Sequence, residues 1–237
     1  MKKKQFKINI NQRTVNCKLN IENYTLHTTY SPLKYIYLEK IDSTQKYLIE
    51  KIKKQELFPP VCVWTELQTD GIGSRGNVWK GKKGNLFFSF AFEKEKFKDV
   101  PLQSLSIYFG WIFKKTLNEL GSKAVMKWPN DIYLIRNEPK KIGGVITNII
   151  NNYIICGIGL NTRFAPEDEF GSLDIELKND KILKRFFSNF EKIRGWDTVF
   201  IEFKNEFEEY KNIFSIEGVL AEDGSIQNNK KRIYSKR

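Results

Sequence analysis

The chain has little of what several common protein chemistries require. It contains one histidine and three cysteines, and Cys17, Cys62 and Cys156 lie far apart with no CxxC pair. A structural zinc site, a disulfide framework and histidine-based acid–base catalysis are therefore not expected. No apolar run is long enough to span a bilayer, and the N-terminal lysines are not followed by the apolar segment of a signal peptide. These absences predict a soluble, cytoplasmic protein without a membrane partner.

The net charge of +12 is concentrated at the two ends of the chain. Residues 1–30 carry a net charge of +5 and residues 226–237 carry another +5, so the 195 residues between them have a net charge of only +2. A strongly basic balance is a common mark of a nucleic-acid-binding or regulatory module. Because the charge lies in the ends, solvated basic tails are favoured, and the nucleic-acid alternative rests on net charge alone.

Capping residues and apolar spacing predict four helices. Asp42 or Ser43 is the expected cap of the first, which ends near Leu57, and Pro101 opens the second, which carries an apolar face to about Leu120. Two further helices are predicted near residues 180–194 and 197–213.

Strand patterns alternate irregularly with these helices. Residues 1–33 are polar and weakly patterned, so no element is assigned there. Strands are predicted at residues 35–41, 61–67, 85–92, 123–128, 131–136, 142–150 and 153–158. The tail has a turn at Asp223-Gly224 and forms one hairpin at most. Because regular βαβ alternation is missing, the fold class is α+β, with a mixed β-sheet packed against helices.

The stretch TDGIGSRGNVW, residues 69–79, combines three glycines with an arginine and a tryptophan. A strand precedes the glycines but no helix follows, which excludes a dinucleotide-binding fingerprint, and the missing GK[ST] excludes a P-loop. What remains is a mobile glycine loop that folds over a ligand, with Arg75 as a cation for phosphate and Trp79 as an apolar wall. The alternative is an ordinary hairpin loop without a ligand.

A second cluster, MKWPNDIYL at residues 126–134, forms a strand–turn–strand junction. There, Lys127, Asn130 and Asp131 can converge on a pocket. An aspartate beside an asparagine suits Mg²⁺ that also binds phosphates. The alternative is a hairpin with a solvated lysine and aspartate.

Two glycine-containing strands complete the candidate site. KKIGGVITNI, residues 140–149, opens with two lysines that suit a carboxylate or phosphate, and its glycines permit close backbone approach. CGIGLNT, residues 156–162, presents Asn161 after two more glycines. The alternatives are a surface lysine pair and a glycine-rich turn.

Taken together, these segments resemble the biotin protein ligase family over about residues 35–215. The segments that carry the resemblance are DSTQ (42–45), TELQTDGIGSRGNVW (65–79), GNLFFSF (84–90), KWPNDIYL (127–134), KKIGGVI (140–146) and GIGLN (157–161). The resemblance implies a class II synthetase-like catalytic fold over residues 34–215. It leaves residues 1–33 as a basic extension and residues 216–237 as a short C-terminal β segment with a basic tail.

The resemblance also implies roles for individual residues. Ser43, Thr44, Gln45, Gln68, Gly71, Ile72, Gly73, Ser74 and Lys141 would bind biotin. Arg75, Trp79, Lys127, Asn130 and Asn161 would bind ATP or the adenylate, and Asp131 would hold Mg²⁺ through the phosphates. Lys141 and Arg75 would be the catalytic cations, with Lys141 between the biotin carboxylate and the α-phosphate.

The implied reaction needs these residue types. A carboxylate must be activated before it acylates an amine, so ATP converts biotin to biotinyl-5'-AMP, and a lysine of the biotin carboxyl carrier protein of acetyl-CoA carboxylase then takes the biotinyl group. Both reactants are anions, which calls for fixed cations and a metal rather than a histidine. A lipoate or octanoate ligase of the same fold is the nearest alternative.

The chain departs from the family pattern in three ways. Ile72, Ser74 and Asn77 stand where arginine is common in the glycine loop, so only Arg75 remains there. Residues 1–33 are too short and too weakly patterned for the winged helix-turn-helix of DNA-binding members, so no sequence-specific DNA binding is expected. The C-terminal barrel of the family is shortened. The resemblance leaves a homodimer open.

Overall fold

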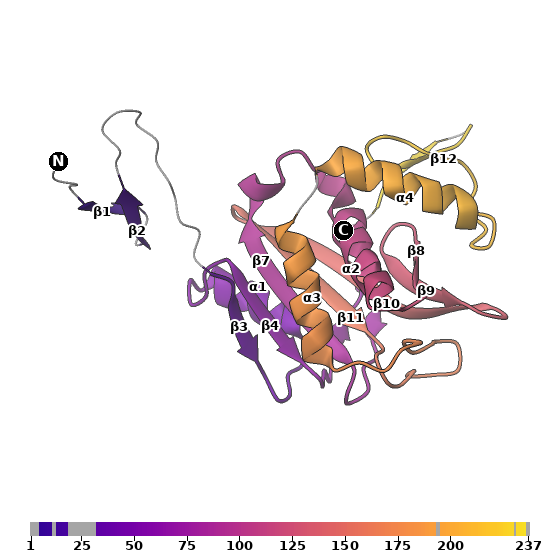
Figure 1. Ribbon diagram of the computed structural model, residues 1–237, viewed down its shortest axis with the longest axis horizontal. Helices are drawn as coiled ribbons and strands as arrows, with labels where there is room; N and C mark the ends of the chain where they lie inside the picture. The colour runs from indigo at the N-terminus through magenta and orange to yellow at the C-terminus, as the bar shows by residue number, and fades with distance from the viewer. Residues whose placement is uncertain (1–4, 11–12, 19–31, 193–194, 230, 236–237) are drawn as a thin grey trace. The chain divides into compact units, whose positions relative to one another are not determined.

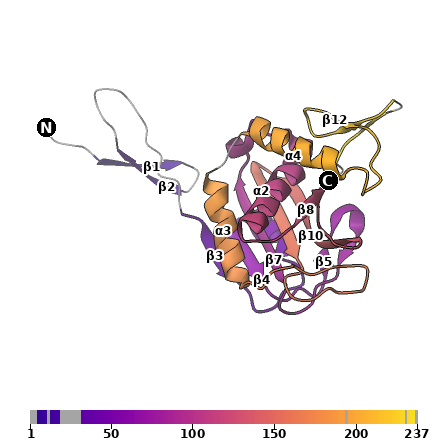
Figure 2. The same cartoon turned by 45° about the vertical axis from the view of Figure 1, so that its right-hand side comes forward.

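The structure is a computed structural model that describes residues 5–10, 13–18, 32–192, 195–229 and 231–235 (Figures 1 and 2). The chain divides into two units, Met1–Leu33 and Lys34–Arg237. In the first unit, β1 (Gln5–Ile10) and β2 (Arg13–Lys18) form an antiparallel pair. Assigning no element to residues 1–33 is therefore wrong: QFKINI at residues 5–10 alternates polar and apolar side chains, which is the pattern of a strand.

The second unit is built on a seven-stranded mixed sheet in the order β3-β4-β7-β11-β10-β9-β8. Its strands are β3 (Lys34–Tyr37), β4 (Val61–Thr65), β7 (Leu86–Glu93), β8 (Val125–Lys127), β9 (Asp131–Ile135), β10 (Pro139–Ile150) and β11 (Tyr153–Leu160). Only β3 and β4 are parallel, and the other neighbours are antiparallel. The predicted α+β class with a mixed sheet is therefore confirmed.

Helices pack on both faces of this sheet (Figures 1 and 2). Successive side chains of a strand point to opposite faces, and β7 shows the result. Phe88 and Phe90 pack their rings against Phe186 of α3 (Asn179–Glu191), beside α2 (Leu105–Glu119). Ala91 belongs instead to the apolar cluster around Leu48 of α1 (Thr44–Lys53). The face under α1 is also the face that carries the candidate site.

The helices begin and end for local reasons. Ser43 caps α1, because its side chain accepts a hydrogen bond from the Lys46 amide at 3.4 Å. The predicted extension of α1 to Leu57 is wrong, since the helix ends at Lys53 and Gln55 takes a left-handed conformation with φ 57°. Pro101 precedes a 3₁₀ turn, η3 (Leu102–Ser104), that leads into α2. No helix among the described residues is long and apolar enough to cross a membrane.

The C-terminal segment follows α4 (Trp196–Tyr210), which packs on α2 and β8. The prediction of one hairpin at most is wrong, because β12 (Val219–Leu220), β13 (Ile226–Gln227) and β14 (Arg232–Ile233) form a three-stranded antiparallel sheet. The second turn contains no glycine. Asn228 forms it instead, with its side-chain oxygen accepting a hydrogen bond from the Lys231 amide at 3.0 Å. The indole of Trp128 donates to the Gly224 carbonyl at 2.9 Å and ties this sheet to the larger one.

Candidate active site

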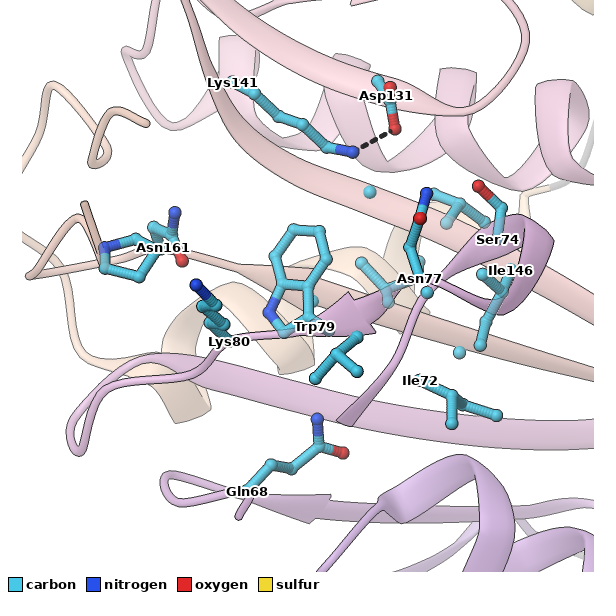
Figure 3. A pocket seen from close by; sticks show the side chains of 18 of the residues that line it. Gln68, Ile72, Ser74, Asn77, Trp79, Lys80, Asp131, Lys141, Ile146 and Asn161 are labelled. Carbon is cyan, nitrogen blue, oxygen red and sulfur yellow. Dashed lines mark ion pairs between the residues drawn. The ribbon is translucent and has the colours of Figure 1, made fainter. Parts of the chain in front are cut away.

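A cavity of about 380 Å³ opens on the α1 face of the seven-stranded sheet (Figure 3). Most residues that the sequence nominated lie around it: Ser43, Thr44, Gln45, Gln68, Ile72, Gly73, Ser74, Trp79, Asn130, Asp131, Lys141 and Asn161. Gly71 is buried beneath Trp79 rather than lining the cavity. Lys127 lines a neighbouring cavity. Arg75 lies in a 3₁₀ turn, and its side chain is outside the described part of the structure.

Glycines make the floor of the cavity. Gly144 of β10 and Gly159 of β11 are direct cross-strand partners, and the Trp79 indole lies against both. A Cβ atom at position 159 would stand 2.8 Å from Cε2 of that indole, and one at position 144 would stand 3.1 Å from its Cζ3. Both glycines therefore allow a close approach to the backbone, and in this structure the group that approaches is the ring of Trp79. The approach of a ligand stays a prediction.

The glycine stretch is a small hairpin in this structure. β5 (Gly71–Ile72) pairs with β6 (Val78–Trp79), and η1 (Ser74–Gly76) forms the turn between them. The Gly73 amide donates to the Asn77 carbonyl at 2.7 Å. The hairpin brings Ile72, Ser74 and Trp79 to the cavity (Figure 3). The opening and closing of this segment with ligand stays a prediction.

One end of the cavity is lined by uncharged polar groups. The backbone amide and the hydroxyl of Thr44 both donate to Oε1 of Gln68, at 2.8 and 3.0 Å. The same hydroxyl lies 2.9 Å from the Ser89 hydroxyl. These contacts join the start of α1 to the segment after β4 and to β7, so the end of the cavity is rigidly framed.

Gln45 contributes an unpaired acceptor to that end. Its Nε2 donates to Oδ1 of Asn148 at 3.0 Å and to the Ile155 carbonyl at 3.4 Å. Because a backbone carbonyl only accepts, the contact with Ile155 fixes which side-chain atom is the nitrogen. Oε1 is then left buried with no hydrogen-bond partner. It sits over Gly157, where a Cβ would stand 2.6 Å away. Gln45 lines the cavity, so a ligand N–H group that reached this buried oxygen would give it a hydrogen-bond partner.

The other end of the cavity is charged. Lys141 of β10 pairs with Asp131 of β9, with 2.7 Å between Nζ and Oδ1, and both side chains are about three-quarters buried (Figure 3). The ammonium also lies 5.4 Å from the centre of the Trp79 ring. An anionic ligand at this wall of the cavity would therefore share the Lys141 ammonium with the Asp131 carboxylate.

Two asparagines from the motifs are engaged within the protein. Asn130 donates from Nδ2 to the Val145 carbonyl at 2.8 Å, which pins the turn before β9 to β10. Asn161 accepts from Asn85 at 3.2 Å and donates to the Gly171 carbonyl at 3.0 Å. The side chain of Asn161 therefore holds the segment after β11 against the cavity.

The sequence motifs missed that segment. Pro166, Glu167, Glu169 and Phe170 line the cavity, and Glu167 forms an ion pair with Lys80, the residue after β6. This exposed ion pair joins the segment after β6 to the loop after β11 at the edge of the cavity. No local pattern marks these residues, because they belong to a loop whose position depends on the hydrogen bonds of Asn161.

A second cavity of about 540 Å³ adjoins the first and shares Asp131 and Lys141 with it. Lys127 lines it, and the C-terminal segment supplies Ser215, Ile216, Glu217, Ile226, Asn228 and Ile233. Next to it, burial, with a smaller contribution from the Asp131 carboxylate, raises the pKa of Tyr133 to about 12, so the phenol is neutral at physiological pH. The C-terminal sheet thus contributes to the wall of the second cavity.

The donor set fits a metal that arrives with phosphates better than a resident one. Among the described residues, no group of three or more His, Cys, Asp and Glu side chains is placed to hold a metal ion. Mg²⁺ is often held by one or two carboxylates together with substrate phosphates and water. Asp131, beside both cavities, supplies one such carboxylate.

Comparisons with known proteins agree with this arrangement. The solved structure of a Helicobacter pylori biotin acetyl coenzyme A carboxylase synthetase with bound biotinylated ATP is similar, with a TM-score of 0.77 and 35% identity over 86% of this chain and 100% of that chain. The bifunctional ligase/repressor BirA of Salmonella typhimurium is 30% identical over 151 residues, 61% of this chain and 45% of that protein. Biotin–protein ligase 1 of Arabidopsis thaliana is 29% identical over 205 residues, 68% of this chain and 53% of that protein.

The chain spans about half the length of these curated relatives. A family model covers residues 37–161, more than half of the chain and the whole stretch from the first strand of the sheet to Asn161. That stretch holds both ends of the first cavity and the glycine floor between them. On these grounds the chain belongs to the biotin/lipoate A/B protein ligase family.

Proposed function

We propose that this protein is an ATP-dependent biotin protein ligase, which activates biotin to biotinyl-5'-AMP and transfers the biotinyl group to a lysine. The observation that carries the proposal is the first cavity itself. It joins an uncharged polar end at Thr44, Gln45 and Gln68 to a charged end, where the Lys141 ammonium is paired with Asp131. Biotin has the same division, with a ureido ring at one end and a carboxylate at the other.

The polar end favours biotin over lipoate or octanoate. The ureido ring carries two N–H groups, and Gln45 offers a buried acceptor that has no partner in the protein. A dithiolane or an alkyl chain has no donor, so it would leave that acceptor unsatisfied, which costs about 1–3 kcal/mol. Ser43, Thr44 and Gln68 complete the frame for the ureido group.

Activation needs two anions to approach each other. Lys141 would stabilise the biotin carboxylate and the α-phosphate together as the carboxylate oxygen attacks phosphorus and pyrophosphate leaves. Trp79 and the glycine hairpin would exclude water from the mixed anhydride. Arg75, Lys127, Asn130 and Asn161 are proposed to act toward the nucleotide. Mg²⁺, held by Asp131 and the phosphates, would neutralise the charge of the leaving group.

The acceptor is proposed to be the biotin carboxyl carrier protein of acetyl-CoA carboxylase, the enzyme that the name of the similar Helicobacter pylori protein contains. The neutral amine of its lysine would attack the carbonyl carbon of biotinyl-5'-AMP, form the amide and release AMP. No sequence-specific DNA binding is part of this proposal, and a homodimer stays open.

The test is to incubate the full chain with ATP, Mg²⁺ and either biotin or lipoate. Pyrophosphate release would be followed, and the acyl-adenylate identified by mass spectrometry. We expect biotinyl-5'-AMP with biotin and little turnover with lipoate, followed by biotinylation of an added carrier protein. Lipoyl-adenylate without biotinyl-adenylate would favour the lipoate alternative, and no adenylate from either acid would refute both.

A further inference from the structure

Two lysines near the junction of the cavities are held in different ways. Lys141 is paired with the Asp131 carboxylate. Among the residues that the structure describes, no carboxylate lies within ion-pair distance of Lys127. Its ammonium instead lies 5.3 Å from the ring centre of Tyr133 and 5.4 Å from that of Phe214. The two rings contact each other edge to face, with centres 5.0 Å apart.

This difference has a consequence for charge. A carboxylate partner offsets the charge of an ammonium, whereas an aromatic face attracts the ammonium through its quadrupole and leaves the full positive charge in place. A lysine side chain has a flexible four-carbon stem and loses much rotamer freedom when it is fixed. Two rings together can restrict Lys127 without neutralising it. With this arrangement, the Lys127 ammonium can bind an anionic ligand without first leaving a carboxylate partner.

The two rings come from separate parts of the chain. Tyr133 lies on β9, two residues after Asp131, and pairs with Lys141 of β10. Phe214 lies after α4, where its amide donates to the Tyr210 carbonyl at 3.3 Å. Its neighbour Ser215 lines the second cavity together with Lys127. Phe214 is also outside residues 37–161, the part matched by the family model.

We propose that Phe214, together with Tyr133, is a positioning residue that holds the Lys127 ammonium in the second cavity for the two terminal phosphates of the nucleotide. The inference rests on the proposed function, in which pyrophosphate is the leaving group. With biotin and the α-phosphate at Lys141, the second cavity is the adjoining space that shares Lys141 and Asp131. Phe214 does not touch the reacting atoms in this scheme, and it acts only through Lys127.

The experiment is a double-mutant cycle measured by pyrophosphate release with biotin and ATP. The variants are Phe214→Leu, Lys127→Met and the two combined, with Phe214→Trp as the conservative variant. Tyr47→Leu is the control, because it removes a lysine–ring contact, with Lys51 Nζ 5.6 Å from the Tyr47 ring, at a residue that lines neither cavity. Thermal unfolding of every variant is recorded.

We expect Phe214→Leu to raise the KM for ATP about three- to tenfold, in line with a cation–π contact in a partly buried site. The KM for biotin should stay within twofold, and Phe214→Trp and Tyr47→Leu should behave like the wild type. In the Lys127→Met variant, adding Phe214→Leu should cause no further rise in the KM for ATP.

Three results would overturn the inference. Additive effects of the two substitutions would show that Phe214 does not act through Lys127. Equal rises in the KM values for ATP and biotin would indicate a general loss of structure. An unchanged KM for ATP in Phe214→Leu would show that the Phe214 ring does not position Lys127 for ATP binding. A wild-type chain that releases no pyrophosphate with biotin would refute the proposed function itself, and this inference with it, which separates that failure from the other three.

Discussion

Replacing Lys141 by alanine removes the cation that the proposed reaction depends on. Its ammonium lies 2.7 Å from the Asp131 carboxylate, and the two side chains are only 24% and 22% exposed. Loss of one partner of such a partly desolvated charge pair, with its contacts to two substrate anions, costs on the order of 2–5 kcal/mol in the transition state. At 1.36 kcal/mol per decade, that is a fall of about 30- to 5,000-fold in the rate of adenylate formation.

Stability should change much less than activity. Asp131 keeps access to water when its partner is lost, so we expect Lys141→Ala to lower the midpoint of thermal unfolding by about 2–4 °C, equivalent to about 1 kcal/mol. Activity is measured as kcat/KM for pyrophosphate release with biotin and ATP. Unfolding is followed by circular dichroism in the same buffer.

Lys140 is the matched control, because it is the adjacent residue of the same strand. Its ammonium pairs with Glu138 at 3.1 Å and donates to the Asp168 carbonyl at 2.7 Å, and the residue lines neither the first nor the second cavity. Lys140→Ala should retain near-normal kcat/KM. Near-normal pyrophosphate release by Lys141→Ala, or an equal loss in Lys140→Ala, would refute the role assigned to Lys141.

The remaining predictions concern the polar end, the floor and the hairpin. Gln45→Leu should weaken biotin binding about 5- to 150-fold, since it removes an acceptor worth about 1–3 kcal/mol, and calorimetry with biotin alone checks this; an unchanged affinity would contradict the role of Oε1. Gly159→Ala should displace the Trp79 indole, because the new Cβ would stand 2.8 Å from it. The KM for biotin should then rise about tenfold, which corresponds to about 1.4 kcal/mol. An unaltered KM would show that the ring is not a wall of the site. Ser74→Arg should slow the escape of biotinyl-5'-AMP, since arginine can make two charge-assisted bonds to one phosphate, and equal off-rates in both proteins would show that retention rests on other groups.

Local sequence was a good guide where apolar runs are long. The strands predicted at 61–67, 85–92 and 153–158 correspond to Val61–Thr65, Leu86–Glu93 and Tyr153–Leu160. Long buried runs leave few alternatives, because both faces of these strands are covered. Short elements were harder. The strand predicted at 35–41 ends at Tyr37, since β3 is an edge strand with one neighbour and little burial.

The residue types of the candidate site can be recognised in the sequence, because the proposed reaction needs particular functional groups. The proposed reaction of two anions calls for a lysine, a metal-binding carboxylate and exposed backbone, and the KWPND, KIGG and GIGLN segments contain these within short stretches. Which of these side chains contact one another depends on strand pairing, which the motifs do not reveal. Lys141 reaches Asp131 because β9 and β10 are paired in a register that sets Gly144 opposite Asp131, with a shift between Lys141 and Gly143.

Contacts across long sequence separations were decided only by the tertiary structure. The Gln45 amide is oriented by Asn148 and Ile155, which lie more than a hundred positions away. The Lys127 ammonium lies 5.4 Å from the ring centre of Phe214, which belongs to a segment with no motif. Residue types and strand-forming runs follow from local composition, so the sequence alone determined the fold class and the residue types of the candidate site. Orientation and pairing depend on which elements pack together, and the sheet order and the C-terminal sheet therefore decided the geometry of the site.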